Sequence, residues 1–234
     1  MEAFRNYFRD IEIKTVLDVG TGGGGFIYEL VQAFPGAEIT GIDPHPESLE
    51  AARENYPAFS FLKMEAEKIL FEDNRFDVVS ISMALHHLSK IKKGLKEMKR
   101  VAKPGGWIII NELVSDHLNE AQQVHRMYHH FKSRIDRMMG ICHRETFTRD
   151  AILQMLKTAS IPVQFFFEYN PEVHFTRDKE EIESRVKKME QALEQIKDRE
   201  EYEQMKPQIG EFRERAMKFG FEPATHLVIV GRSR

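Results

Sequence analysis

The fold of this chain is decided by the stretch Val16-Leu17-Asp18-Val19-Gly20-Thr21-Gly22-Gly23-Gly24-Gly25-Phe26. A short apolar run of β-type residues carries one carboxylate, Asp18, and passes directly into a glycine-rich turn and a helix-compatible stretch. Glycine lets the backbone adopt positive φ and lets a ligand approach without meeting a Cβ. A strand, a glycine turn and a helix N-terminus therefore predict an α/β fold that holds a nucleotide-like ligand at residues 20–25.

Strand and helix signals alternate on both sides of this turn. Such alternation predicts right-handed βαβ units and a parallel sheet. We expect strands at 15–19, 38–42, 58–63, 76–82, 106–112, 163–169 and 225–230. We expect helices at 2–10, 25–34, 46–55, 89–102, 116–140 and 149–159.

A long helical segment precedes the final strand. Asp178 and Glu181 have the spacing of a capping box, which predicts a helix start. Two apolar series at helical spacing follow, and they predict two helices packed as a hairpin, with a dimer seam or a mobile lid as alternatives. The series are Ile182, Val186, Met189, Leu193 and Ile196, then Met205, Ile209, Phe212, Ala216 and Phe219.

Composition limits the class of protein. The 234 residues are 41% hydrophobic and 30% charged, which suits a soluble α/β chain. The 34 basic and 37 acidic residues give no electrostatic case for binding nucleic acid. No apolar run approaches the roughly 20 residues that span a bilayer, and the N-terminus lacks a signal pattern. Because Cys142 is the single cysteine, we expect no internal disulfide and a cytoplasmic setting.

Two carboxylates indicate which ligand the turn holds. Asp43 ends the second predicted strand, about 20 residues after the glycines, where an acid can accept hydrogen bonds from both ribose hydroxyls. The alternative is a structural turn in which Asp43 caps the next helix before Pro44 and Pro46. Asp18 would repel a pyrophosphate by about a kcal/mol or more, but would attract an ammonium and a sulfonium. The sequence therefore favours S-adenosylmethionine over NAD.

These residues resemble the class I S-adenosylmethionine-dependent methyltransferases, especially the type 11 and quinone-biosynthesis-like groups. The resemblance covers about residues 14–112 and includes four of the family's motifs and a later stretch. The corresponding segments are 16–24, 41–44, 63–71, 76–88 and 95–110. Met64 and Glu65 depart mildly from the third motif, which often has Gly and Asp there. The resemblance implies a Rossmann-like three-layer sandwich with a seven-stranded, mostly parallel sheet of order 3-2-1-4-5-7-6. It implies the cofactor-binding residues Asp18, Gly20, Thr21, Gly22, Gly24, Asp43, Pro44, Glu65, Ala66, Ser82 and His87.

The methyl transfer itself needs little from the protein. A sulfonium is a good leaving group, so positioning and electrostatics supply most of the acceleration. A general base matters only if the attacking atom must lose a proton. His86 and His87 follow the fourth strand at the edge where ligands bind, and they are our catalytic candidates. The alternative is that one packs against the cofactor or caps the following helix.

A histidine-rich segment raises the question of a metal. His125 and His129 share a helix face, a spacing compatible with a transition metal. No third ligand has a fixed register with that pair, so we predict no metal site. We expect the helix to line the acceptor pocket with Tyr128 and Phe131. The other residues considered as ligands are His117, His130, Cys142, His143 and Glu145.

The sequence thus predicts a single methyltransferase domain, 1–234, that transfers a methyl group to a small organic acceptor by direct displacement. Helical insertions at about 115–146 and 171–222 are expected to cover the acceptor site, and the C-terminal helices offer a homodimer contact. The alternatives are a methyltransferase acting on protein or RNA, an NAD(P)-dependent oxidoreductase, and a non-catalytic cofactor-binding protein.

Overall fold

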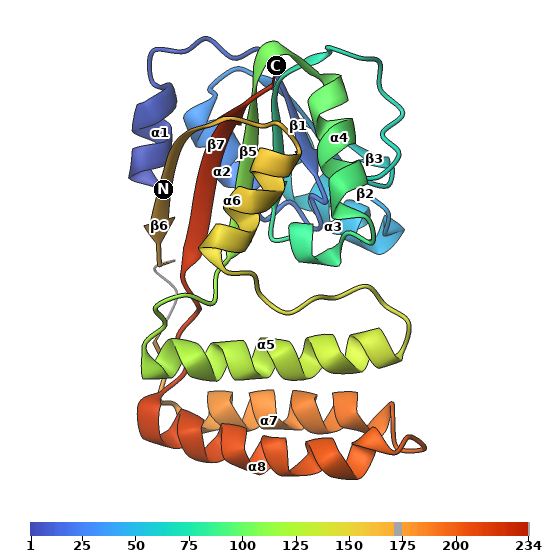
Figure 1. Cartoon of the computed structure of the whole chain (residues 1–234), viewed down its shortest axis with the longest axis vertical. Helices are drawn as coiled ribbons and strands as arrows, with labels where there is room; N and C mark the ends of the chain where they lie inside the picture. The colour runs from blue at the N-terminus through green and yellow to red at the C-terminus, as the bar shows by residue number, and fades with distance from the viewer. Residues whose placement is uncertain (171–174, 234) are drawn as a thin grey trace. The chain divides into compact units, whose positions relative to one another are not determined.

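A seven-stranded sheet forms the core of the computed structural model, which describes residues 1–170 and 175–233 (Figure 1). The strand order β3-β2-β1-β4-β5-β7-β6 confirms the order implied by the resemblance. Pairing is parallel from β3 through β5, while β7 runs opposite to β5 (Figure 1). The strands are β1 (Thr15–Val19), β2 (Glu38–Asp43), β3 (Ser60–Lys63), β4 (Phe76–Ser82), β5 (Ala102–Leu113), β6 (Val163–Tyr169) and β7 (His226–Arg232).

The chain divides into two compact units. The sheet unit comprises Met1–Glu112, Asp150–Tyr169 and Leu227–Arg234, and the helical unit comprises Leu113–Arg149 and Asn170–His226. The first residues of the predicted insertion at 171–222, namely 171–174, lie outside the described residues. The helices of the sheet unit are α1 (Glu2–Phe8), α2 (Ile27–Ala33), α3 (Pro46–Asn55), α4 (Ile91–Val101) and α6 (Arg149–Thr158), with a 3₁₀ turn at Leu85–His87.

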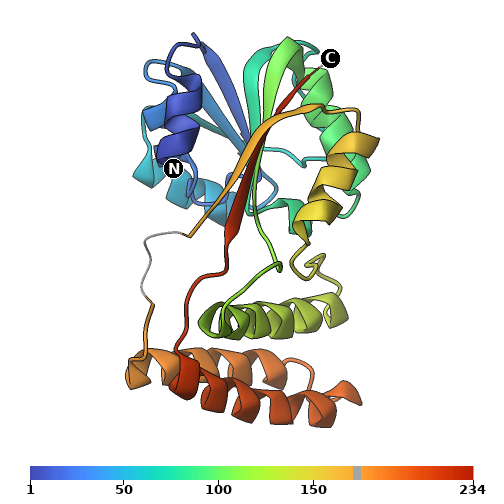
Figure 2. The ribbon, with the colours of Figure 1, turned by 60° about the vertical axis from the view of Figure 1, so that its left-hand side comes forward.

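Apolar side chains cover both faces of the sheet, as buried parallel strands require. On one face, Phe4 and Phe8 of α1 join side chains of α2 and α3 in one cluster over β1, β2 and β4. On the other face, α4 buries an apolar stripe that includes Leu95 and Met98. Figure 2 shows α4 and α6 on the side of the sheet opposite α1 and α2. The sheet is thus the middle of three layers.

The helical unit is built from α5 (Glu120–Met138), α7 (Lys179–Glu194) and α8 (Glu201–Phe219). Asp178 caps α7, because its Oδ1 accepts a hydrogen bond from the Glu181 backbone N–H at 2.9 Å. Most of the two predicted apolar series is buried in one cluster, with Val124, Phe131 and Ile135 of α5. The hairpin prediction is confirmed, since α7 and α8 pack against each other and against α5 within the chain.

Two predicted boundaries are wrong by four residues, each for a local reason. The expected helix 116–140 begins only at Glu120, because His117 has a φ of +52° and Asn119 forms a capping box with Gln122. The expected strand 106–112 begins at Ala102, because the register shift opposite Phe76–Val78 accommodates a bulge before Trp107. Among the described residues, no helix is both long and apolar enough to cross a bilayer.

Candidate functional site

The glycine turn follows β1 at the carboxyl edge of the sheet, where parallel sheets bind ligands. Gly20 has a φ of +67°, and a Cβ there would lie 2.5 Å from Cβ of Ala84, so only glycine fits. Gly22 also has a positive φ, +54°, but a Cβ there would meet no atom within 4 Å. The backbone at Gly22, like that at Gly25, is therefore an open part of the predicted cradle.

Asp18 lies in β1, two residues before this turn, and is 1% exposed. Its Oδ1 accepts a hydrogen bond from the Ser80 hydroxyl at 2.8 Å, whereas its Oδ2 has no hydrogen-bond partner among the described residues. Burial raises the pKa of Asp18 to about 6, although the hydroxyls of Ser80 and Thr21 lower it and the charge of Asp43 raises it further. At pH 7 the group is mostly ionised and electrostatically uncompensated. Because its oxygens are not at the surface, the carboxylate would attract a cationic ligand by its electric field and not by direct contact.

Asp43 ties the end of β2 to the glycine turn. Its Oδ2 accepts a hydrogen bond from the Gly22 backbone N–H at 3.0 Å, and its Oδ1 accepts one from the His45 backbone N–H at 2.9 Å. Oδ1 also lies 3.0 Å from Nδ1 of His45, whereas Oδ2 has only the Gly22 N–H as a hydrogen-bond partner among the described residues. The second lone pair of Oδ2 is therefore compatible with a ribose hydroxyl as a further donor. The positioning of the turn by Asp43 is a role that sequence reasoning missed. Pro44 connects Asp43 to His45, the N-cap of α3.

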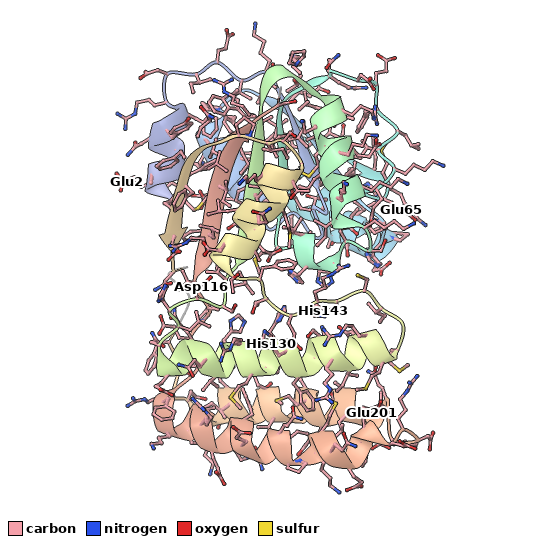
Figure 3. The ribbon with its side chains drawn as sticks, in the orientation of Figure 1. Glu2, Glu65, Asp116, His130, His143 and Glu201 are labelled. Carbon is pink, nitrogen blue, oxygen red and sulfur yellow. The ribbon has the colours of Figure 1, made fainter. Side chains whose placement is uncertain are left out.

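The predicted adenine contact lies beside the same edge. The Met64 backbone N–H donates to the Asp43 carbonyl at 3.2 Å, which sets the segment after β3 next to the end of β2. Glu65, labelled in Figure 3, is exposed and pairs with Lys68 in an isolated bridge, while Ala66 is buried. The structure therefore brings Glu65 and Asp43 to neighbouring strand ends.

Ser82 belongs to a polar group at the ends of three strands. The Asn111 side-chain amide donates to the Ser82 hydroxyl at 2.9 Å, and the Tyr169 hydroxyl forms a long hydrogen bond, 3.5 Å, to the Asn111 carbonyl oxygen. Burial raises the pKa of Tyr169, so its hydroxyl stays protonated and donates. Sequence reasoning missed Asn111 and Tyr169. Their only signal is the position of each polar residue at the end of an apolar strand.

His86 and His87 lie on the 3₁₀ turn after β4, and they differ in their surroundings. Nδ1 of His86 lies 2.9 Å from Oε2 of Glu112, and both side chains are buried. The same carboxylate oxygen accepts a hydrogen bond from the His86 backbone N–H at 3.3 Å. A carboxylate on Nδ1 fixes the tautomer and makes Nε2 the basic nitrogen. His87 is exposed and its ring is tilted by 43° against that of His86, with ring centroids 4.2 Å apart. Glu112 is a further residue that the sequence did not identify.

The histidines of the helical unit have separate partners. Nδ1 of His125 accepts a hydrogen bond from the Ala224 backbone N–H at 2.8 Å, and burial lowers the pKa of His125 to about 4. His129 instead contacts His143, with their Nε2 atoms 3.2 Å apart. His130, on α5 in Figure 3, lies 2.8 Å from the Thr146 hydroxyl. The predicted pair at 125 and 129 therefore does not act as one site.

The predicted pocket residues Tyr128 and Phe131 serve the core of the helical unit. Tyr128 packs on Phe212, with ring centroids 5.8 Å apart, and Phe131 is 3% exposed. Phe131 also lines a cavity of about 460 Å³ within this unit, together with Arg126, Arg134, Met189 and Phe212 among others.

Known proteins are similar to this chain in the region that contains the glycine turn and Asp43. The family model described as "Methyltransferase domain" matches residues 17–110. A demethylmenaquinone methyltransferase of Chlorobaculum tepidum is 36% identical over 135 residues, which are 58% of this chain and 54% of that protein. The chain spans about half the length of the curated relatives that it matches.

Solved structures share the fold. The YcgJ protein of Bacillus subtilis matches with a TM-score of 0.67 at 17% identity, over 100% of this chain and 98% of that chain. A SAM dependent methyltransferase from Aquifex aeolicus matches with a TM-score of 0.53 at 25% identity, over 70% and 81% of the two chains. The matched region, residues 17–110, contains the glycine turn, most of β1 and the strands β2 to β4, so this part of the chain is similar to the methyltransferase domain family.

Proposed function

We propose that this chain is an enzyme that transfers the methyl group of S-adenosylmethionine to a small organic acceptor. The observation that carries the proposal is the buried carboxylate of Asp18, whose Oδ2 has no hydrogen-bond partner among the described residues, next to the glycine turn with its open backbone at Gly22. A dinucleotide would bring negative pyrophosphate to this charge, whereas S-adenosylmethionine brings an ammonium and a sulfonium. In this proposal Asp43 and Glu65 bind the ribose and the adenine, and Gly20, Thr21, Gly24, Pro44, Ala66, Ser82 and His87 complete the cofactor site.

When bound, the cofactor supplies a methyl group on a positively charged sulfur. That methyl group would pass to the acceptor by direct displacement, with the sulfur as the leaving group. The chain's own contribution is to hold both reactants in line and to surround the reacting centre with fixed charges. Where the acceptor must lose a proton, Nε2 of His86 would receive it, and Glu112 would stabilise the imidazolium that forms.

The name of the relatives suggests the first acceptor to test. Demethylmenaquinone is a quinone, and we propose a ring of that chemical class as the acceptor of this chain. Its reduced form carries ring hydroxyls, which lose a proton as a ring carbon attacks a methyl group. The His86–Glu112 pair suits that requirement.

The helical unit and the location of the protein are further parts of the proposal. We infer that segments 115–146 and 171–222 choose the acceptor and that the protein works in the cytoplasm. The apolar stripes of α7 and α8 are used within the chain. A homodimer through these helices would therefore use their remaining, polar faces.

Calorimetry tests the cofactor assignment directly. We expect S-adenosylmethionine and S-adenosylhomocysteine to bind and NADH not to bind. Binding of NADH without binding of S-adenosylmethionine would overturn the assignment. A positive result is then followed by turnover with a reduced quinone and with a panel of phenols, amines and carboxylates as acceptors.

A further inference from the structure

Two histidines of the helical unit point the same ring nitrogen at each other. His129 lies in α5, and His143 lies on the segment after it, where Figure 3 labels it. Their Nε2 atoms are 3.2 Å apart, and their ring planes are nearly perpendicular, at 87°. Imidazoles that converge from different segments in this way are the usual ligands of transition metals.

The distance between the two nitrogen atoms suits a shared ion. Zinc lies about 2.0–2.1 Å from a histidine nitrogen. An ion at about 2.05 Å from both Nε2 atoms, which are 3.2 Å apart, would make an angle of about 103° with them. That angle is close to the tetrahedral value of about 109° that zinc adopts in proteins. The distance between the two Nε2 atoms therefore matches that between two ligands of one tetrahedral ion.

A carboxylate contacts the second ring nitrogen of one of these two histidines, His143. Oδ2 of Asp136 lies 2.6 Å from Nδ1 of His143, and the His143 side chain is buried. A carboxylate on the second ring nitrogen holds a histidine in the tautomer that ligates metals and raises its basicity. This contact is independent of the distance between the two Nε2 atoms, and it indicates the same ligand.

We propose that His129 and His143 bind a divalent transition metal ion, with Asp136 as the positioning residue for His143. Neutral imidazoles favour zinc, cobalt, nickel or copper over magnesium and calcium, which prefer oxygen. Zinc is the ion to test first, with water or further ligands in its remaining positions. The proposal concerns the helical unit alone and does not rest on the methyl transfer proposed above.

The spacing of the histidines in the sequence does not predict this pair. On α5 the obvious partner of His129 is His125, one turn earlier, but Nδ1 of His125 accepts a hydrogen bond from the Ala224 backbone. The partner found in the structure lies beyond the end of the helix, so no fixed helical spacing predicts it.

Equilibrium dialysis of the full chain tests the proposal. The protein is stripped with a chelator, dialysed against zinc and assayed for bound metal. We expect one zinc ion per chain in the wild type and at least about tenfold weaker binding in His129→Ala and in His143→Ala. Asp136→Asn should weaken binding by about 10–100-fold, as supporting carboxylates do elsewhere. The matched control His130→Gln changes the next residue of α5 and should retain the metal.

A second measurement guards against alanine variants that do not fold. Cobalt(II) in the wild-type protein should give the strong visible absorption of a tetrahedral site with nitrogen ligands, and Asp136→Asn should weaken its binding. Far-UV circular dichroism checks each variant. The proposal is overturned if the wild type binds no zinc or if His129→Ala and His143→Ala bind it as tightly. The three side chains would then form only a hydrogen-bond chain. Calorimetry with S-adenosylmethionine on the metal-free protein separates this result from the proposed activity.

Discussion

Neutralising Asp18 should stabilise the protein without its ligand. The Asp18 pKa of about 6 in the folded chain stands against an ordinary value of 3.8, because burial disfavours the charged form. Between these values the folded chain holds a proton that the unfolded chain releases. The free energy of unfolding therefore falls as the pH rises through this window and stays lower above it. The full difference is about 3 kcal/mol.

Asp18→Asn removes that cost and keeps an oxygen to accept the bond from Ser80. We expect the variant to exceed the wild type in free energy of unfolding by about 3 kcal/mol at pH 8 but by only about 1 kcal/mol at pH 4.5. Urea denaturation at the two pH values measures both differences. The exposed acid Asp10 provides the control, since Asp10→Asn should show no such pH dependence.

A bound cationic ligand should favour the ionised form of Asp18, whereas burial alone favours the protonated form. A cationic ligand favours the ionised carboxylate, so the affinity of the wild type for S-adenosylmethionine should rise between pH 5 and pH 7. Asp18→Asn should bind more weakly at pH 7 and should show a flat profile in calorimetry. A gain in stability equal at pH 8 and pH 4.5, or a wild-type affinity that ignores pH, would refute the reasoning.

Three further predictions address other parts of the molecule. Asp43→Ala should lower the free energy of unfolding by about 3 kcal/mol, because it removes two backbone bonds to a charged group. Calorimetry should show a loss in cofactor affinity of about 1–3 kcal/mol, and an unchanged affinity would remove the ribose assignment. Glu112→Gln should lower kcat by about 10²-fold with little change in KM, and adding His86→Ala should cost little more if the two act as a unit. Phe212→Ala should lower the stability of the helical unit by about 3–5 kcal/mol in urea denaturation, since the ring is fully buried; a loss below about 1 kcal/mol would contradict its place in that core.

The fold was predictable because its signals are local. β4 and α3 have the expected bounds, since a buried strand and a proline-started helix are each specified within about ten residues. The late start of α5 depends on the capping box that Asn119 forms with Gln122, a local signal that the sequence also contains. The early start of β5 is different, because its bulge appears only when β4 is alongside.

The site was predictable only where one segment carries the chemistry. The glycine turn and Asp43 were identified from spacing, but the bonds by which Asp43 holds Gly22 were not. Glu112 and Asn111 were missed because their partners are 26 and 29 residues away along the chain. Such contacts are set by strand order, and a single sequence gives no spacing rule for them.

The division of the chain has a consequence for how such proteins diversify. The helical unit is assembled from two separate stretches, Leu113–Arg149 and Asn170–His226, so the backbone passes between the units four times. Each passage lies at or next to the end of a strand or helix, so neither stretch interrupts the pairing of the sheet. Exchanging the helices between homologues therefore requires two grafts made together, and a single graft would leave α5 without the partners that bury its apolar side. Under the proposed function, specificity for a new acceptor would evolve by exchange of both helical stretches together, while the sheet unit stays unchanged.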